Sequence, residues 1–216
     1  MGSLERRDQL LQAALSLFAI KGYHVTKVSD IVKEVGVAQG TFYWYFKSKE
    51  EIAIEMIQKG REELLVVIHA GYREQAGTVD DMVDSSMHLV KSLLEFSSNN
   101  RNFMILLLLK GQGADEPVRK EISATIIAIE QAFAGNIERA VELHMLEDQR
   151  DVSLQAQMLT NLVTGMISRW LFGPYYELDY KPEKSYEVIA REIVYFEFYG
   201  LLGRKGFKSE NDRHTQ

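Results

Sequence analysis

Apolar residues recur at spacings of three and four positions along nearly the whole chain of 216 residues. Leu10, Ala14 and Leu17 show this spacing in the first segment, and Ile122 and Ile126 show it far along the chain. A period of about 3.6 is that of an amphipathic α-helix, and no segment alternates with period two for long enough to predict a sheet. The sequence therefore predicts an all-α protein of about nine helices.

Residues with strong preferences for helix ends divide this pattern into separate helices. Gly36 follows an apolar stretch, in the place where a left-handed glycine commonly ends a helix. Thr26 and Thr78 each precede such a stretch and can cap the helix that follows. Ser48, with a glutamate three residues later, has the form of a capping box and predicts the start of a long helix. The last two helices are expected at about residues 153–172 and 183–202.

Composition excludes several classes of protein. The chain has no cysteine, which rules out disulfide scaffolds, cysteine nucleophiles and cysteine-ligated metal sites. Its longest uninterrupted apolar run is 103–109, far short of the roughly 20 residues that span a bilayer. No signal peptide is recognisable at the N-terminus, so a cytoplasmic protein without membrane partners is expected.

Catalytic motifs are weak or missing. Gly111 and Gly113 lack the third glycine and the preceding strand of a dinucleotide-binding loop. No Gly-x-Ser-x-Gly sequence occurs, and no histidines are spaced as metal ligands. We therefore expect neither enzyme activity, nor a cofactor, nor a bound metal.

Charge is unevenly distributed along the chain. Seven Lys and Arg against four Asp and Glu give residues 1–49 a net charge of +3, whereas the remainder carries −9. A basic segment on an acidic protein is a weak indication of nucleic-acid binding through that segment. On charge alone, an accident of composition remains an equal alternative.

Residues 26–46 contain two short helical segments separated by a tight turn at 34–38. This spacing is typical of a helix-turn-helix, in which the second helix enters the major groove. We predict a DNA-binding domain at 1–49, with the helix-turn-helix at about 27–46, followed by a helical bundle at 50–216. The amide of Gln39 and the hydroxyl of Thr41 suit hydrogen bonds to bases and phosphates. The adjacent aromatics Tyr43, Trp44 and Tyr45 could instead pack into the core of a helical hairpin.

A continuous pattern of motifs runs through residues 13–52: Ala-Ala-x-x-Leu-Phe at 13–18, Lys-Gly-Tyr at 21–23, Gly-Thr-Phe-Tyr at 40–43 and Tyr-Phe-x-x-Lys at 45–49. With these motifs the segment resembles the DNA-binding domain of the TetR family of bacterial transcriptional regulators. A pattern spread over about 40 residues without a gap is highly specific. The rest of the chain is similar to the family only in its length and its helical character.

The resemblance implies a role for each matching position. Thr26 would cap the supporting helix and touch phosphate, Gly40 would allow close approach to DNA, and Trp44 would fill space between the two helices. The full set of DNA-contacting positions that it implies is Thr26, Lys27, Gln39, Gly40, Thr41, Tyr43, Tyr45 and Lys49.

The family resemblance also implies that the bundle binds a small molecule and dimerises. A three-helix domain cannot reach two major grooves alone, so a homodimer on a near-palindromic operator of double-stranded DNA is expected. The last two helices carry more apolar faces than a small bundle needs, although these faces could also lie within one subunit. The predicted dimer contacts are Leu154, Met158, Leu162, Tyr186, Ile189, Ile193 and Phe196.

Large, adaptable side chains within the bundle suit an apolar, irregular ligand. At helical spacing the same side chains are common as plain core. The predicted pocket residues are Leu64, Ile68, Met87, Phe103, Met104, Phe133, Met166 and Trp170.

These features together predict a homodimeric repressor that a small apolar or amphipathic effector releases from its operator. An activator, or a DNA binder that responds to no ligand, would use the same DNA-binding domain and remains an alternative.

Overall fold

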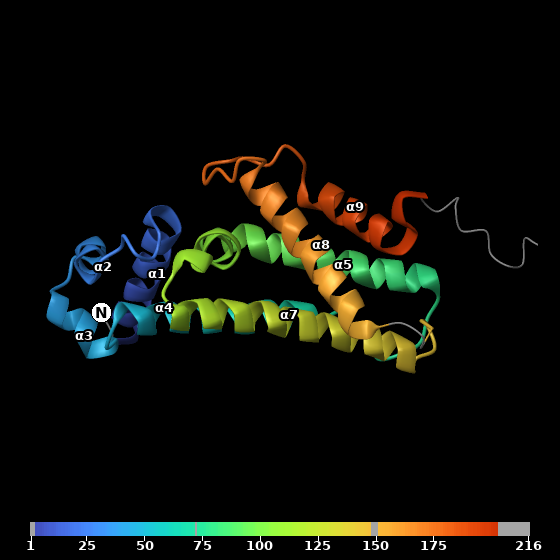
Figure 1. Ribbon diagram of the computed structural model, residues 1–216, viewed down its shortest axis with the longest axis horizontal. Coiled ribbons are helices and arrows are strands. Elements are labelled where there is room, and N and C mark those ends of the chain that lie inside the picture. The colour runs from blue at the N-terminus through green and yellow to red at the C-terminus, as the bar shows by residue number, and fades with distance from the viewer. Residues whose placement is uncertain (1–2, 72, 148–150, 203–216) are drawn as a thin grey trace, which may run out of the picture.

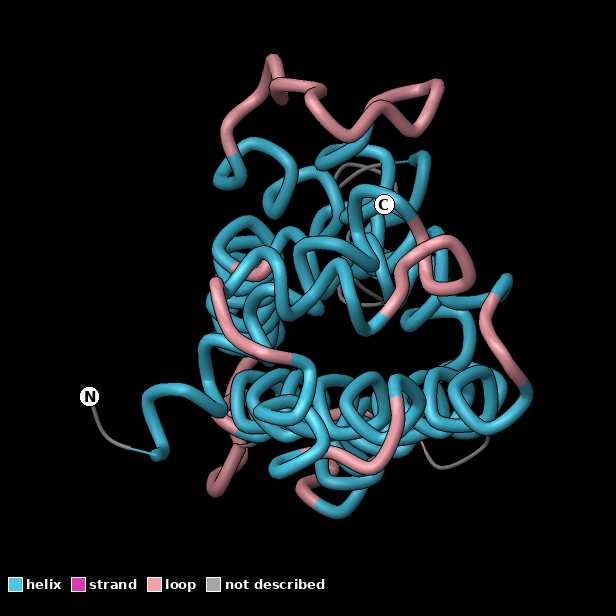
Figure 2. Tube along the Cα trace, turned by 90° about the vertical axis from the view of Figure 1, so that its left-hand side faces the viewer, coloured by secondary structure: helices cyan, strands magenta, loops and turns pink. Residues whose placement is uncertain are grey.

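The computed structural model describes residues 3–71, 73–147 and 151–202, and within these ranges the chain forms nine α-helices and no strand (Figures 1 and 2). The predicted all-α class is confirmed. The helices are α1 (Ser3–Lys21), α2 (Val28–Val35), α3 (Gln39–Tyr45), α4 (Lys49–His69), α5 (Val79–Asn99), α6 (Arg101–Ile105), α7 (Glu116–Glu142), α8 (Val152–Phe172) and α9 (Tyr186–Tyr199). A π-helical turn (Leu106–Lys110) and a 3₁₀ turn (Gly111–Gly113) continue α6.

Helices α1, α2 and α3 form a small unit at one end of the molecule, called the head below (Figure 1). Its core consists of side chains that are almost fully buried, among them Leu10, Phe18, Ile31, Phe42 and Phe46. Burial of this apolar surface holds the two short helices, which would be marginal alone, against α1.

Three of the predicted helix boundaries follow from local chemistry. Gly36 ends α2 with φ of 72°, a left-handed conformation that favours glycine. Ser48 caps α4, because its hydroxyl accepts a hydrogen bond of 3.1 Å from the amide of Glu51. Thr78 caps α5 in the same way, with a distance of 3.2 Å to the amide of Asp81.

The prediction that Thr26 caps α2 is wrong. Lys27 occupies the N-cap position, and its backbone N–H donates to the Asp30 carboxylate at 2.9 Å. The Thr26 hydroxyl turns inward instead and donates to the carbonyls of Gly22 and Leu17, at 2.8 and 3.3 Å. The hydroxyl therefore closes the loop between α1 and α2.

The remaining helices form an elongated body (Figure 1). Helices α4 and α7 pack side by side along its length, α8 crosses α7, and α9 packs on α5. The last helix is shorter than predicted and begins at Tyr186, after the N-cap residue Ser185. In the loop before it, the carbonyl of Lys184 accepts a hydrogen bond of 2.8 Å from Trp170 Nε1. Gly200 ends it with φ of 56°.

No helix in the described part of the chain has both the length and the apolar character to cross a membrane.

Candidate nucleic-acid interface and effector cavity

Helix α3 turns one face inward and the other to solvent. Phe42 is fully buried and anchors the helix to the head, whereas Gln39, Gly40 and Tyr43 are exposed and Thr41 is half-buried. Gly40 has open space where a Cβ would stand, so nothing in the protein itself requires a glycine there. The exposed side of α3 thus presents an amide, two hydroxyls and bare backbone to any partner.

The prediction that Trp44 fills space between the two helices is wrong, because 82% of its surface is exposed. Phe42 is buried in the core, and a residue two positions further along the same helix is rotated by about 200° from it. Trp44 therefore extends outward, and this spacing was the signal that could have revealed it. Tyr45 is half-buried and packs against the core.

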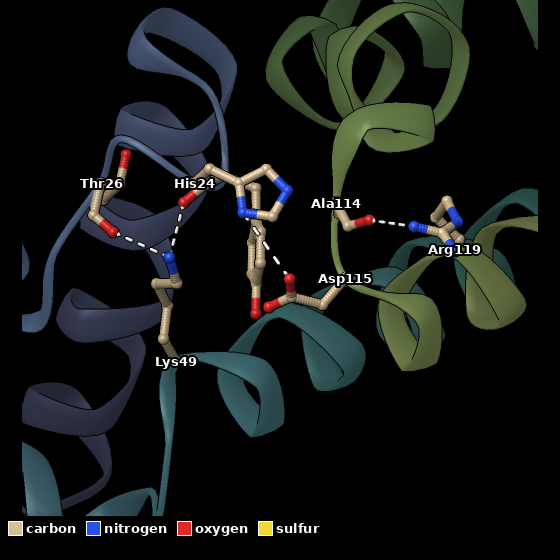
Figure 3. Close-up of polar contacts among 7 residues, drawn as sticks. His24, Thr26, Lys49, Ala114, Asp115 and Arg119 are labelled. Carbon is tan, nitrogen blue, oxygen red and sulfur yellow. Dashed lines mark hydrogen bonds and ion pairs between the residues drawn. The ribbon is translucent and has the colours of Figure 1, made fainter.

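The Lys49 ammonium is held inside the head (Figure 3). It donates to the carbonyls of Tyr23 and Thr26 at 2.8 and 3.1 Å and lies 4.2 Å from the centre of the Tyr23 ring. Burial lowers the pKa of this lysine. Of the predicted phosphate contacts, Lys27 is exposed. Lys47, which lies two residues after the end of α3 and is not among the predicted contacts, is exposed as well.

A second set of contacts joins the head to the body. The Tyr23 hydroxyl bonds to the carboxylate of Asp115, the residue that precedes α7, and burial together with that charge raises the Tyr23 pKa. His24 Nδ1 lies 3.6 Å from the same carboxylate (Figure 3), and Lys110 donates to the carbonyl of Ile20 at 2.6 Å. The loop after α1 is therefore fastened to the start of α7.

An apolar groove lies open along α8 and α9, with a volume of about 730 Å³. Of the predicted dimer contacts, Leu162, Ile193 and Phe196 line the groove, and Leu154 and Met158 are exposed on α8. Tyr186 and Ile189 are half-buried against the core. Met166, which we assigned to the pocket, lines the groove as well, together with Glu192, Tyr195, Tyr199 and Leu201.

A smaller cavity, of about 110 Å³, lies inside the body between α5, α7, α8 and α9. Phe133 is the predicted pocket residue that lines it. The others are placed elsewhere: Leu64, Ile68, Phe103, Met104 and Trp170 are buried in the core, Met87 is half-buried, and Met166 lies in the outer groove.

Asn136 is the unexpected residue of this cavity. Both its Oδ1 and its Nδ2 are buried, and neither has a hydrogen-bond partner in the described part of the chain. The sequence held a signal for it, since Asn136 interrupts an apolar stripe of α7 between Phe133 and Ala140 at spacings of three and four.

Polar groups also surround the cavity mouth. Ser86 donates a hydrogen bond of 2.7 Å to the carboxylate of Glu197. Desolvation by the surrounding protein raises the pKa of this carboxyl, although the residue as a whole is exposed. Arg73 donates to the Ser85 hydroxyl at 3.0 Å. No group of three or more His, Asp or Glu in the described ranges is arranged to hold a metal ion.

Residues 10–56 match the model of the bacterial regulatory proteins of the tetR family. The fatty acid metabolism regulator protein of Bacillus subtilis is 23% identical over 182 residues, which cover 84% of this chain and 87% of that protein. The fatty acid degradation regulator FadR of Bacillus halodurans has a similar fold, with a TM-score of 0.77, 21% identity and coverage of 92% and 97% of the two chains. The structure of FadR from Bacillus subtilis in complex with stearoyl-CoA gives a TM-score of 0.73, with 21% identity over 89% of this chain and 98% of that one.

Proposed function

Because the chain belongs to the TetR family of bacterial transcriptional regulators, we propose that it is a homodimeric repressor which binds a palindromic operator and leaves it when an amphipathic effector enters the body. It acts in the cytoplasm and catalyses no reaction. The observation that carries the proposal is the exposed face of α3, where Gln39, Thr41 and Tyr43 lie beside the bare backbone of Gly40. These groups match the donors and acceptors that base edges and phosphates offer.

Dimerisation is supported by the groove along α8 and α9. Side chains such as Met158, 65% exposed, and Phe196, 47% exposed, form an apolar surface that water solvates poorly. Two helices from each subunit would cover it as a four-helix interface. The same pairing would set two heads apart by a fixed distance, as a palindromic site requires.

The cavity between α5, α7, α8 and α9 supports release by a ligand that changes the shape of the body. At about 110 Å³ it is smaller than the roughly 300–1,000 Å³ of typical ligand sites, so a drug-sized effector must widen it. An effector that binds only the widened body shifts the population toward that shape. The likeness to a regulator solved with stearoyl-CoA supports a ligand with a long apolar part.

Helix α7 offers a path between cavity and head. Asn136 lies in the cavity and Asp115 at the head, 21 positions apart, which corresponds to about 30 Å along a helix. Helix α4 runs beside α7, and Arg61 on α4 pairs with Glu121 on α7 at 2.7 Å. A widening of the cavity would thus move α7 and α4 together and change the spacing of the two heads, with a coupling of about 1–3 kcal/mol.

Selection of bound sequences from a random duplex pool, at near-physiological salt, tests the proposal. We expect enrichment of one palindrome, and footprinting of a dimer over both halves. Phe42→Ala, which disrupts the core of the head, is the control that should lose selection. Ile127→Val, a small apolar change at an exposed position of α7, should leave selection unchanged. If folded, dimeric protein enriches no sequence, the proposal is wrong.

A further inference from the structure

The amide of Asn136 is buried, and neither of its polar atoms has a hydrogen-bond partner among the residues that the structure describes. Most buried polar groups in native proteins are hydrogen-bonded, because an unpaired amide loses its bonds to water without replacement. An amide in this state destabilises the body, and a leucine of similar shape would avoid the loss. Such a group is expected where a partner from outside the chain completes its bonds.

Apolar side chains from four helices line much of the cavity that contains Asn136. Val90 on α5, Phe133 on α7 and Val163 on α8 line the cavity and are buried. Phe198 on α9 lines it as well and is half-buried. In such surroundings an ionised head group would lose its hydration, whereas a neutral polar group would not carry that cost.

The polar groups at the cavity mouth are already engaged with one another. Ser86 is bonded to Glu197, and Arg73 donates to the Ser85 hydroxyl and, at 2.6 Å, to the carbonyl of Asp81. Asn136 also lines this cavity, but it differs from them because neither its donor nor its acceptor has a partner within the described residues.

We propose that Asn136 is the recognition group for an effector that carries a neutral amide-like group, one donor beside one acceptor, on an apolar body. Nδ2 donates to the carbonyl of the ligand, and Oδ1 accepts from its N–H. An ester offers no donor and an amine offers no carbonyl, so each leaves one atom of the asparagine unpaired. A site built for hydrogen bonds discriminates strongly against ligands that lack them. The inference rests on the proposed function in one respect: the ligand is called an effector because its binding is expected to release the operator.

Three probes of equal chain length test it: octanamide, methyl octanoate and octylamine. Calorimetry with the full-length wild-type protein is expected to give at least about tenfold tighter binding of octanamide than of the other two. In Asn136→Leu this preference falls to within about twofold. Gln131→Leu makes a similar change on the exposed side of α7 and keeps the wild-type preference.

Thermal unfolding without ligand supplies a second readout. Asn136→Leu is expected to raise the midpoint by about 2–4 °C, since it removes an unsatisfied buried amide. A lowered midpoint would mean that the amide has partners in the folded protein, and would overturn the inference. So would equal binding of the three probes, a preference that survives in the leucine variant, or no binding of octanamide.

DNA binding separates this inference from the proposed function. Ligand-free Asn136→Leu should bind the selected operator as wild-type does, while octanamide no longer releases it. If wild-type selects no operator yet prefers octanamide in calorimetry, the repressor proposal fails and the recognition role of Asn136 stands.

Discussion

The ammonium of Lys49, at the first residue of α4, donates a hydrogen bond of 2.8 Å to the carbonyl of Tyr23 and lies over the Tyr23 ring. The same ring carries the hydroxyl that bonds to Asp115 at the start of α7. Lys49 and Tyr23 therefore join the two long helices of the body to the loop after α1. A lysine used in this way stabilises the head and contributes little as a free charge toward phosphate.

Replacing Lys49 with methionine should lower the free energy of unfolding by about 1–2 kcal/mol, because two carbonyls lose a charged donor. The dependence of operator binding on salt should keep its slope. Chemical denaturation and binding titrations over a salt series measure the two quantities.

Lys47→Met is the matched control, since Lys47 is exposed and lies two residues after the end of α3. It should leave stability within about 0.5 kcal/mol and reduce the salt slope by about one. The opposite pattern, with a changed slope and unchanged stability for Lys49→Met, would return Lys49 to a phosphate-contact role.

Replacing Gly40 with alanine should separate folding from DNA binding. Gly40 is helical and a Cβ meets nothing within 4 Å, so alanine should stabilise the protein by up to about 1 kcal/mol. The added methyl group would stand between α3 and the DNA and should weaken operator binding about tenfold or more, measured by fluorescence anisotropy with a labelled duplex.

Gly36→Ala gives the contrasting control, because Gly36 has φ of 72° and alanine there costs roughly 1 kcal/mol or more. Undiminished operator affinity in Gly40→Ala would show that the DNA does not approach this part of α3.

Trp44→Ala should leave the free energy of unfolding within about 0.5 kcal/mol, since the side chain is 82% exposed. Operator affinity should fall, because an exposed aromatic next to Tyr43 can pack on sugars or thymine methyl groups. Phe42→Ala, which empties a buried site, should cost about 3–5 kcal/mol in the same denaturation assay. A loss of stability in Trp44→Ala comparable to that of Phe42→Ala would favour a role in the core.

Helix positions were predictable because their signals are local: Gly36 ends α2 through its own φ, and Ser48 and Thr78 cap the residues that follow them. The direction of a polar side chain that can point either to solvent or to the core was not predictable from the sequence. The Thr26 hydroxyl bonds to Leu17, nine positions earlier, and Lys49 bonds to Tyr23, 26 positions earlier, so tertiary packing decided both.

Long-range packing also limited what the sequence could say of the body. The family resemblance identifies the exposed positions of α3, because the predicted base-contacting groups Gln39, Thr41 and Tyr43 all lie on this one short helix. A cavity made by four helices depends on how they cross, and large apolar residues such as Met104 and Phe103 fit the core equally well. The polar residue on an apolar stripe, Asn136, was the better guide to the cavity.

A substitution at Met158, an exposed residue of α8, tests whether the apolar surface of α8 and α9 forms the interface between subunits. Met158→Glu places a charge on an apolar surface, which a dimer could bury only at the cost of desolvating it. Sedimentation velocity should show a folded monomer for this variant and a dimer for wild-type. Operator affinity should fall by two orders of magnitude or more, because each head then binds its half-site alone. Ile127→Glu makes the same kind of change at an exposed apolar residue of α7 and should remain dimeric. If Met158→Glu were still a dimer with full operator affinity, the subunits would have to meet through another face.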